Sequence, residues 1–290
     1  MTPGRRQRVD VDPRWHSRAR RARTLITDRP HTAPLLQFYL SILEIQTGVC
    51  AAIDVSPWTR TVETPNGEGG PRLQLERLPL GTLSVDFSAF CRAIPKTAPG
   101  PVRHAAGVLA GAATEPRANL LLSMLTGEDL APLADAFGCE IAPLAFLPRA
   151  FLSPVAETLS ALAPAGATGT ASVCPQCGWP PLVSRLEDES HAAGVRRLFC
   201  AFCAADWTFP RAVCPACGVS GESGLEFHVD EGLAHMRIEA CKTCRRYLKS
   251  VDRRVLGFAE PLVDDLATPE LDLWATQQGL DKIAPNLLGL

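Results

Sequence analysis

The sequence predicts an α+β fold with a helical N-terminal domain, two tandem rubredoxin-like or zinc-ribbon-like metal modules of four cysteines each, and a helical C-terminal tail. Three observations predict this organisation. Apolar residues recur at helical spacing through the first half of the chain. Eight of the eleven cysteines form four C-x-x-C pairs in the second half. A stretch rich in Pro, Ala and Gly, 163–170, separates the two halves as a linker.

Length and composition limit the class of protein. A chain of 290 residues has room for two domains, and 46% hydrophobic with 21% charged residues excludes a disordered or collagen-like chain. The sequence has no run of about 18 apolar residues, so we expect no transmembrane helix. The first residues contain no apolar signal segment, so we expect a cytoplasmic protein without membrane insertion.

The N-terminus is basic. The first 29 residues contain nine Arg and three Asp. We expect a flexible basic arm over 1–16 and a short basic helix over 17–27. Such an arm can contact nucleic acid or an acidic partner, or it can simply be solvated.

A helical domain is expected over 17–163. Its clearest element is a helix of about 18 residues that begins at Pro34, because apolar residues follow at spacings of three and four. A loop is expected over 56–80, which is rich in Pro, Gly and Thr. Further helices are expected near 84–94, 101–113, 117–126, 128–138 and 145–163. Pro148 and Pro154 are expected to interrupt or start the last of these.

The paired cysteines carry the functional argument. The pairs are Cys174/Cys177, Cys200/Cys203, Cys214/Cys217 and Cys241/Cys244, with gaps of 22, 10 and 23 residues between them. In a chain without a visible secretion signal, this pattern favours metal ligands over disulfides. A tetrahedral ion takes four thiolates, a two-residue spacer lets one turn present two sulfurs, and a hairpin brings in a second turn.

An internal repeat assigns the pairs to sites. Cys-Pro-Gln-Cys-Gly at 174–178 recurs forty residues later as Cys-Pro-Ala-Cys-Gly at 214–218, and a plainer pair follows each. The Gly permits the positive φ that a turn around sulfur needs. We therefore expect one site in a first ribbon, 171–210, and another in a second ribbon, 211–252. The first consists of Cys174, Cys177, Cys200 and Cys203, and the second of Cys214, Cys217, Cys241 and Cys244. Crossed pairing remains the alternative.

The identity of the metal stays open at this stage. Four thiolates suit zinc or a single rubredoxin-type iron, and an iron–sulfur cluster also takes four cysteines. Free dithiols engaged in redox exchange are a further alternative. His191, His228 and His235 could each replace a cysteine but are expected at the surface or in hairpins. Cys50, Cys91 and Cys139 are expected to be small buried hydrophobic residues. The sequence has no catalytic signature motif, so no enzyme is expected.

The tail and the surface charge complete the pattern. A helical tail is expected over 253–290, with a helix that starts at Thr268 and Pro269 and a stop at Gly279. Residues 171–255 contain eleven Lys or Arg against ten Asp or Glu, which is too balanced for a typical nucleic-acid surface. A local basic run nevertheless consists of Lys242, Arg245, Arg246, Lys249, Arg253 and Arg254.

The cysteine pairs, in this order and with these gaps, resemble those of the formate dehydrogenase accessory protein FdhE family. The likeness continues after Cys244 as Arg246-Tyr247-Leu248-Lys249. It extends through Glu260-Pro261, Asp264-Asp265-Leu266-Ala267, Leu271-Asp272 and Pro285-Asn286-Leu287-Leu288. The chain differs from the family in its extended Arg-rich start and in the segment 56–80.

The resemblance implies a cytoplasmic assembly factor, not a catalyst. Proteins of this family are needed for active respiratory formate dehydrogenase, bind its immature catalytic subunit and are linked to rubredoxin-type iron. By the same resemblance the eight paired cysteines are the metal ligands, whereas Asp264, Asp265 and Asp272 have no assigned role. The alternatives are a rubredoxin-like protein that transfers electrons or sulfur during client maturation and a nucleic-acid-binding zinc ribbon. Homo-oligomerisation stays open.

Overall fold

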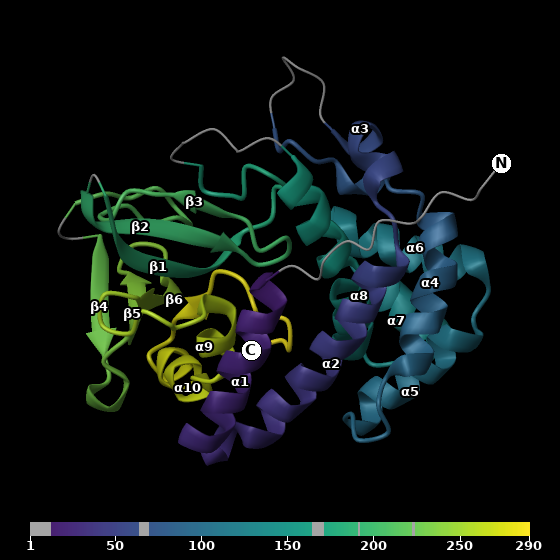
Figure 1. The fold of residues 1–290 in the computed structure, drawn as a ribbon, viewed down its shortest axis with the longest axis horizontal. Helices are drawn as coiled ribbons and strands as arrows, with labels where there is room; N and C mark the ends of the chain where they lie inside the picture. The colour runs from purple at the N-terminus through teal and green to yellow at the C-terminus, as the bar shows by residue number, and fades with distance from the viewer. Residues whose placement is uncertain (1–12, 64–69, 164–170, 191, 222–223) are drawn as a thin grey trace.

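The computed structural model describes residues 13–63, 70–163, 171–190, 192–221 and 224–290. It confirms the predicted fold class: helices build the N-terminal part, and one sheet contains both cysteine-rich modules. Figure 1 shows the helices on one side, the sheet on the other, and the two tail helices beside the sheet. The first helix lies between the tail and the rest of the helical part.

The first two helices pack against each other at the start of the helical part. Helix α1, Pro13–Asp28, starts earlier than predicted, and residues 1–12 of the expected arm lie outside the described residues. Helix α2, Ala33–Ala52, confirms the predicted long helix. By length and composition alone, Pro30–Ala52 is long and apolar enough to cross a membrane, and 33% of its apolar stretch is buried. Helices α7 and α8 are long and apolar enough for a membrane span only when they are taken together, and a bend of 99° separates them. Because α2 packs against α1, α4 and α8, its apolar residues serve the core.

The further helices agree with the predicted order. They are α4 Leu80–Ala93, α5 Gly100–Gly111, α6 Thr114–Thr126, α7 Ala131–Phe137 and α8 Ile141–Leu162. The predicted loop, 56–80, contains the short helix α3, Thr59–Val62. Residues 64–69 of this loop lie outside the described residues. Short 3-10 turns accompany the N-terminal part at Pro30–Thr32, Ser56–Trp58 and Leu75–Arg77. The loop therefore has more local structure than its Pro and Gly content predicts.

The predicted interruption of the last helix was wrong, since α8 contains both Pro148 and Pro154. A proline in a helix leaves the carbonyl four residues earlier without its usual donor. For Pro154 that carbonyl belongs to Ala150, and the Gln46 side-chain amide of α2 donates to it at 2.7 Å. A neighbouring helix thus replaces the missing hydrogen bond, which the sequence of α8 alone does not reveal.

Within the described residues, the two cysteine-rich modules share a single seven-stranded sheet. The first contributes β1 Pro181–Glu189, β2 Ala192–Cys200 and β3 Asp206–Thr208, and the second contributes β4 Leu225–Val229, β5 Met236–Cys241 and β6 Arg246–Asp252. The order is β3-β2-β1-β6-β5-β4, with β7, Asp281–Lys282, beside β6. Strands β1 and β6 pair in parallel, with Val183 opposite Lys249, and so join the modules. The tail adds α9, Pro261–Leu266, and α10, Pro269–Gln277.

The hydrophobic core crosses the predicted module borders. The four cysteines of the first module belong to the same buried cluster as the helical residues Phe87, Leu147 and Phe151. Sheet residues and α10 form a second cluster, and α1, α2 and α9 form a third. The limits expected for the arm, domains and tail stay a prediction, because shared cores join these parts.

Candidate metal centres

The structure brings the eight paired cysteines together as two quartets. One consists of Cys174, Cys177, Cys200 and Cys203, and the other of Cys214, Cys217, Cys241 and Cys244. Within each quartet all sulfur atoms lie within 4.8 Å of one another. This is the sequential arrangement expected from the repeat, and not the crossed alternative.

The first turn of each quartet follows the repeat closely. In the first, Gly178 donates its backbone N–H to the Cys174 carbonyl at 2.8 Å, and in the second Gly218 donates to Cys214 at 2.9 Å. The φ angles of the two glycines are +78° and +75°. The repeated Cys-Pro-x-Cys-Gly sequence therefore folds twice into the same turn, because glycine adopts this left-handed conformation at little cost.

The second turn of each quartet reaches the same conformation without glycine. Ala204, directly after Cys203, has φ of +53°, and Arg245, directly after Cys244, has φ of +59°. Among the described residues these are the two non-glycine positions with positive φ. Such residues store strain that surrounding structure must hold. Sequence reasoning missed them, since their identity gives no hint, but each occupies the position of the repeat's glycine.

The sulfur geometry fits a tetrahedral thiolate site. Cys174 and Cys203 Sγ atoms are 3.6 Å apart, and those of Cys177 and Cys200 are 3.4 Å apart. In the second quartet the corresponding distances are 3.8 and 3.7 Å. Four sulfurs at about 2.3 Å from one ion would be separated by about 3.8 Å, so both quartets could hold a zinc or iron ion.

The donor set also calls for a cation on electrostatic grounds. Hydrogen bonds from the neighbouring thiols hold the pKa of Cys174 far below its usual range, whereas burial raises the pKa of Cys200. Hydrogen bonds with Cys174 raise the pKa of Cys203. The clustered thiols therefore oppose one another's ionisation. A divalent ion is the group that allows all four sulfurs to ionise together.

The two quartets differ in burial. All four cysteines of the first are buried, whereas Cys217 of the second is exposed and Cys244 half-buried. The segment Arg72–Leu73 covers the first quartet: its two backbone N–H groups donate to the carbonyls of Pro175 and Gln176 at 3.1 and 2.7 Å. The first site is therefore sealed between module and helices, and the second faces solvent.

Substituting the repeat glycines is expected to separate conformational cost from packing. An added Cβ at Gly178 would lie 3.2 Å from Pro71 Cγ, whereas at Gly218 it would meet no described atom within 4 Å. We expect Gly218→Ala to lower the free energy of unfolding by about 1–2 kcal/mol through the positive φ alone. Gly178→Ala should lower it further. Denaturant unfolding of the metal-loaded proteins measures both, and equal losses would contradict a role for Pro71.

A buried arginine supports the first quartet. Arg149 of α8 donates to the carbonyls of Ala201 at 2.7 Å, Pro285 at 2.9 Å and Asn286 at 2.8 Å. Its guanidinium also lies over the Trp179 ring, at 5.6 Å from the centroid. Burial lowers the pKa of Arg149 to about 10, and the group stays cationic at neutral pH beside Cys200. Sequence reasoning missed it; a single charge inside the apolar stretch 141–156 was the available signal.

Among the described residues, the other candidate ligands lie outside both quartets. The His228 ring packs against Trp274 with centroids 4.6 Å apart and a tilt of 49°, His235 contacts Asp264, and His191 is outside the described residues. Cys91 is buried, which raises its pKa to about 12. Cys50 and Cys139 are half-buried, so the expectation of buried cysteines holds fully only for Cys91.

The acidic tail motif forms a buried ionic cluster with the sheet. Lys249 of β6 lies 3.1 Å from Asp265 and 2.7 Å from Asp272, and Lys282 lies 3.0 Å from each of these carboxylates. Tyr247 donates to Asp272 at 2.8 Å. Burial lowers the pKa of Lys249. Burial acts to raise the pKa of Asp265, but the two lysines outweigh it and hold that pKa below its ordinary value. The motif residues therefore attach the tail to the second module.

The carboxylate of Asp264, next to Asp265 in the chain, binds the N-terminal helix α1. Arg21 of α1 contacts Asp264 at 2.5 Å, and His235 contacts the same carboxylate at 3.0 Å. Arg18 lies 3.0 Å from Glu157 of α8. Part of the basic N-terminus therefore forms ion pairs inside the protein. The basic run that the sequence shows after Cys241 does not form one free charged surface. Lys249 is buried, and Lys242 and Arg254 form ion pairs with neighbouring acids.

The ion pair of Asp264 predicts an acid-sensitive contribution to stability. Burial raises the pKa of Asp264, but His235 and Arg21 outweigh it and hold the pKa below its ordinary value. Stability from a depressed carboxyl pKa is fully present above the unfolded value, about 4, and is lost as pH falls through the folded value. Unfolding free energies of wild type and Asp264→Asn should therefore converge below about pH 4. A constant difference from pH 7 to pH 3 would contradict this.

The fold and the quartets define a class of protein: a helical domain fused to paired four-cysteine modules in one sheet, with sites suited to tetrahedral metal ions. Family models described as "FdhE, central domain" and "FdhE, C-terminal domain" match residues 173–211 and 213–288. The crystal structure of the FdhE protein from Pseudomonas aeruginosa is similar, with a TM-score of 0.74, 25% identity and 94% coverage of both chains.

The chain is also similar to curated proteins that are named as FdhE homologs. The Protein FdhE homolog of Aquifex aeolicus is 38% identical over 40% of this chain and 41% of its own length. That of Pseudomonas putida is 31% identical over 65% of this chain and 59% of its own length. The chain thus covers less than two thirds of these relatives in the matches. It belongs to the FdhE family.

Proposed function

We propose that this chain is a cytoplasmic assembly factor that binds the immature catalytic subunit of formate dehydrogenase and is needed for active enzyme. The client follows from the FdhE resemblance. In this proposal the chain acts as a binding protein and not as a catalyst, without inserting into the membrane. The observation that carries it is the pair of sulfur quartets on one continuous sheet.

The eight paired cysteines act as ligands of two mononuclear metal ions in this proposal. Sulfur separations of 3.4 to 3.8 Å suit zinc or rubredoxin-type iron equally. Backbone N–H groups of Phe202 and Cys203 point at Cys200 Sγ at 3.3 and 3.4 Å. Such donors stabilise a thiolate once it is formed. The two metal-loaded quartets then fix the surface offered to the client.

Genetic complementation tests the proposal. In a strain lacking its own FdhE, wild type should restore formate dehydrogenase activity, and Cys174→Ser/Cys177→Ser should fail to do so. The Cys139→Ser variant is the matched control, because Cys139 is half-buried outside both quartets. Wild type and Cys139→Ser should co-purify with the catalytic subunit, and the Cys174→Ser/Cys177→Ser variant should not. Normal activation by the double variant after loss of its metal would overturn the proposal.

A further inference from the structure

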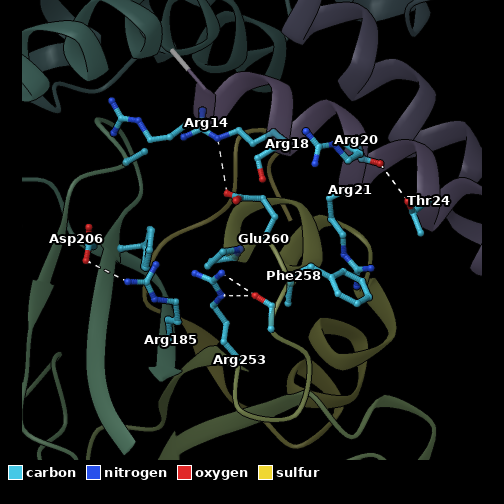
Figure 2. A pocket seen from close by; sticks show the side chains of 16 residues that line it. Arg14, Arg18, Arg20, Arg21, Thr24, Arg185, Asp206, Arg253, Phe258 and Glu260 are labelled. Carbon is cyan, nitrogen blue, oxygen red and sulfur yellow. Dashed lines mark hydrogen bonds and ion pairs between the residues drawn. The ribbon is translucent and has the colours of Figure 1, made fainter. Parts of the chain in front are cut away.

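An arginine-lined pocket lies at the junction of α1, the first module and the tail. Its volume is about 660 Å³, within the range of ligand-binding cavities. Figure 2 shows its side chains converging from α1 above, from β1 and from the loop before α9. Six arginines and two acids line it: Arg14, Arg18, Arg20, Arg21, Arg185, Arg253, Asp206 and Glu260. Acids behind the lining pair with some of these arginines, so the excess of positive charge is smaller than this count.

Part of this charge is already used within the protein. Arg18 and Arg21 each have a carboxylate, Glu157 and Asp264 respectively, and Arg185 contacts Asp206 at 3.5 Å. Arg20 is different: its guanidinium is exposed and forms no hydrogen bond or ion pair with any residue that the structure describes. One face of the pocket therefore offers a positive charge without an internal partner.

Two arginine nitrogen atoms in the pocket wall are buried without a hydrogen-bond partner among the described residues. They are the Nε atoms of Arg18 and Arg185. Arg18 as a whole is only 4% exposed, and its Nε lies 3.8 Å from Glu260, beyond hydrogen-bonding distance. Both atoms are covered by the protein itself, so the accessible guanidinium of Arg20 carries the argument for a ligand.

The distribution of charge indicates the class of ligand. The guanidinium groups come from three separate segments and surround an open volume, so they match several separated carboxylates better than one compact phosphate. Phe258, at 67% exposure, and Pro261 add apolar surface beside the charges. An acidic peptide with an occasional apolar side chain offers both features.

We propose that this arginine pocket binds an acidic peptide segment. The identity of its owner, the formate dehydrogenase catalytic subunit, rests on the proposed function. The pocket is also lined by Phe199 and Ala204, which stand beside Cys200 and Cys203. A folded first module is therefore required to complete the pocket wall, which couples peptide docking to the metal state of that quartet.

Fluorescence anisotropy with the full-length, metal-loaded chain tests the pocket. The probe is a labelled peptide of about ten residues in which Glu predominates and Leu is interspersed, and the control peptide has Gln in place of each Glu. Arg20→Glu should weaken binding of the Glu peptide about tenfold or more, because it replaces attraction by repulsion. Arg23→Glu is the matched control: Arg23 is exposed on the same helix, lies outside the pocket lining, and should leave binding unchanged.

A variant with the opposite sign excludes simple misfolding. Glu260→Gln removes a negative charge from the pocket and should tighten binding of the Glu peptide. Equal binding of the Gln peptide, or unchanged binding by Arg20→Glu, would overturn the proposal. Displacement of the peptide by inorganic phosphate at a lower concentration than by unlabelled peptide would overturn the peptide as ligand.

The same variants separate this inference from the proposed function. The peptide titration contains no formate dehydrogenase, so it reports on the pocket alone. Peptide binding without activation of formate dehydrogenase in the complementation strain would support the pocket and overturn the assembly role. Normal activation by an Arg20→Glu variant that has lost peptide binding would overturn client docking through this pocket and leave the assembly role standing.

Discussion

Loss of the first quartet is expected to unfold much more of the protein than loss of the second. Cys174→Ser/Cys177→Ser removes two ligands from a site whose four cysteines lie in the main core beside the helical domain. Metal binding to structural Cys sites contributes about 10–16 kcal/mol in small peptides, as much as the entire stability of a typical domain. We therefore expect the cooperative thermal transition of the helices to be lost or strongly shifted to lower temperature.

The second quartet provides the comparison. Cys214 and Cys241 belong to a small separate cluster with Leu225, Cys244 packs against it, and Cys217 is exposed. Cys214→Ser/Cys217→Ser should also remove one equivalent of metal, while the transition of the helical domain remains. Elemental analysis and far-ultraviolet circular dichroism, which reports helix, measure both effects. Equal loss of helical signal in the two double variants would contradict the shared core.

Disruption of the buried ionic cluster is the second large effect. Asp265→Asn leaves Lys249 and Lys282 with one carboxylate, Asp272, between them, at positions that are 0% and 9% exposed. Removing one partner from a buried ion pair costs about 3–5 kcal/mol, because the remaining charge loses its compensation. We expect a loss of that size in the free energy of unfolding, measured with denaturant on metal-loaded protein.

An exposed carboxylate on the same tail serves as control. Asp281 begins β7, and its side chain is exposed. Asp281→Asn should change the free energy of unfolding by less than about 0.5 kcal/mol, as surface substitutions usually do. Similar losses for Asp265→Asn and Asp281→Asn would show that the cluster contributes nothing beyond a surface charge.

Local chemistry explains what the sequence could predict. The quartets follow from spacing, because a C-x-x-C turn presents two sulfurs whatever surrounds it. The α2 helix follows from periodicity. The positive φ angles of Gly178 and Gly218 were predictable, because the repeat gives the same five-residue turn twice. These elements depend on residues that are neighbours in the chain.

The remaining features depend on contacts between distant segments. Helix α8 continues past Pro154, where the Ala150 carbonyl accepts a hydrogen bond from Gln46, 104 residues away in the chain. The tail carboxylates form buried ion pairs only because β6 and α1 come to lie beside α9. The same holds for the arginine pocket, whose walls come from three segments. Sequence periodicity does not encode such pairings, so neither their partners nor their burial could be read from spacing.

The parallel pairing of β1 with β6 has a consequence for synthesis of the chain. Val183 and Lys249 are neighbours in space, although the rest of the first module and most of the second lie between them. The edge of β1 that β6 covers is therefore unpaired while the ribosome is still producing the second module, and long-range pairings of this kind form slowly. An unpaired edge is prone to wrong association. A nascent chain that stops before Arg246 thus contains all four cysteines of the first quartet while the adjacent strand β1 has one uncovered edge. The last strand of the second module, β6, later covers that edge within the same chain.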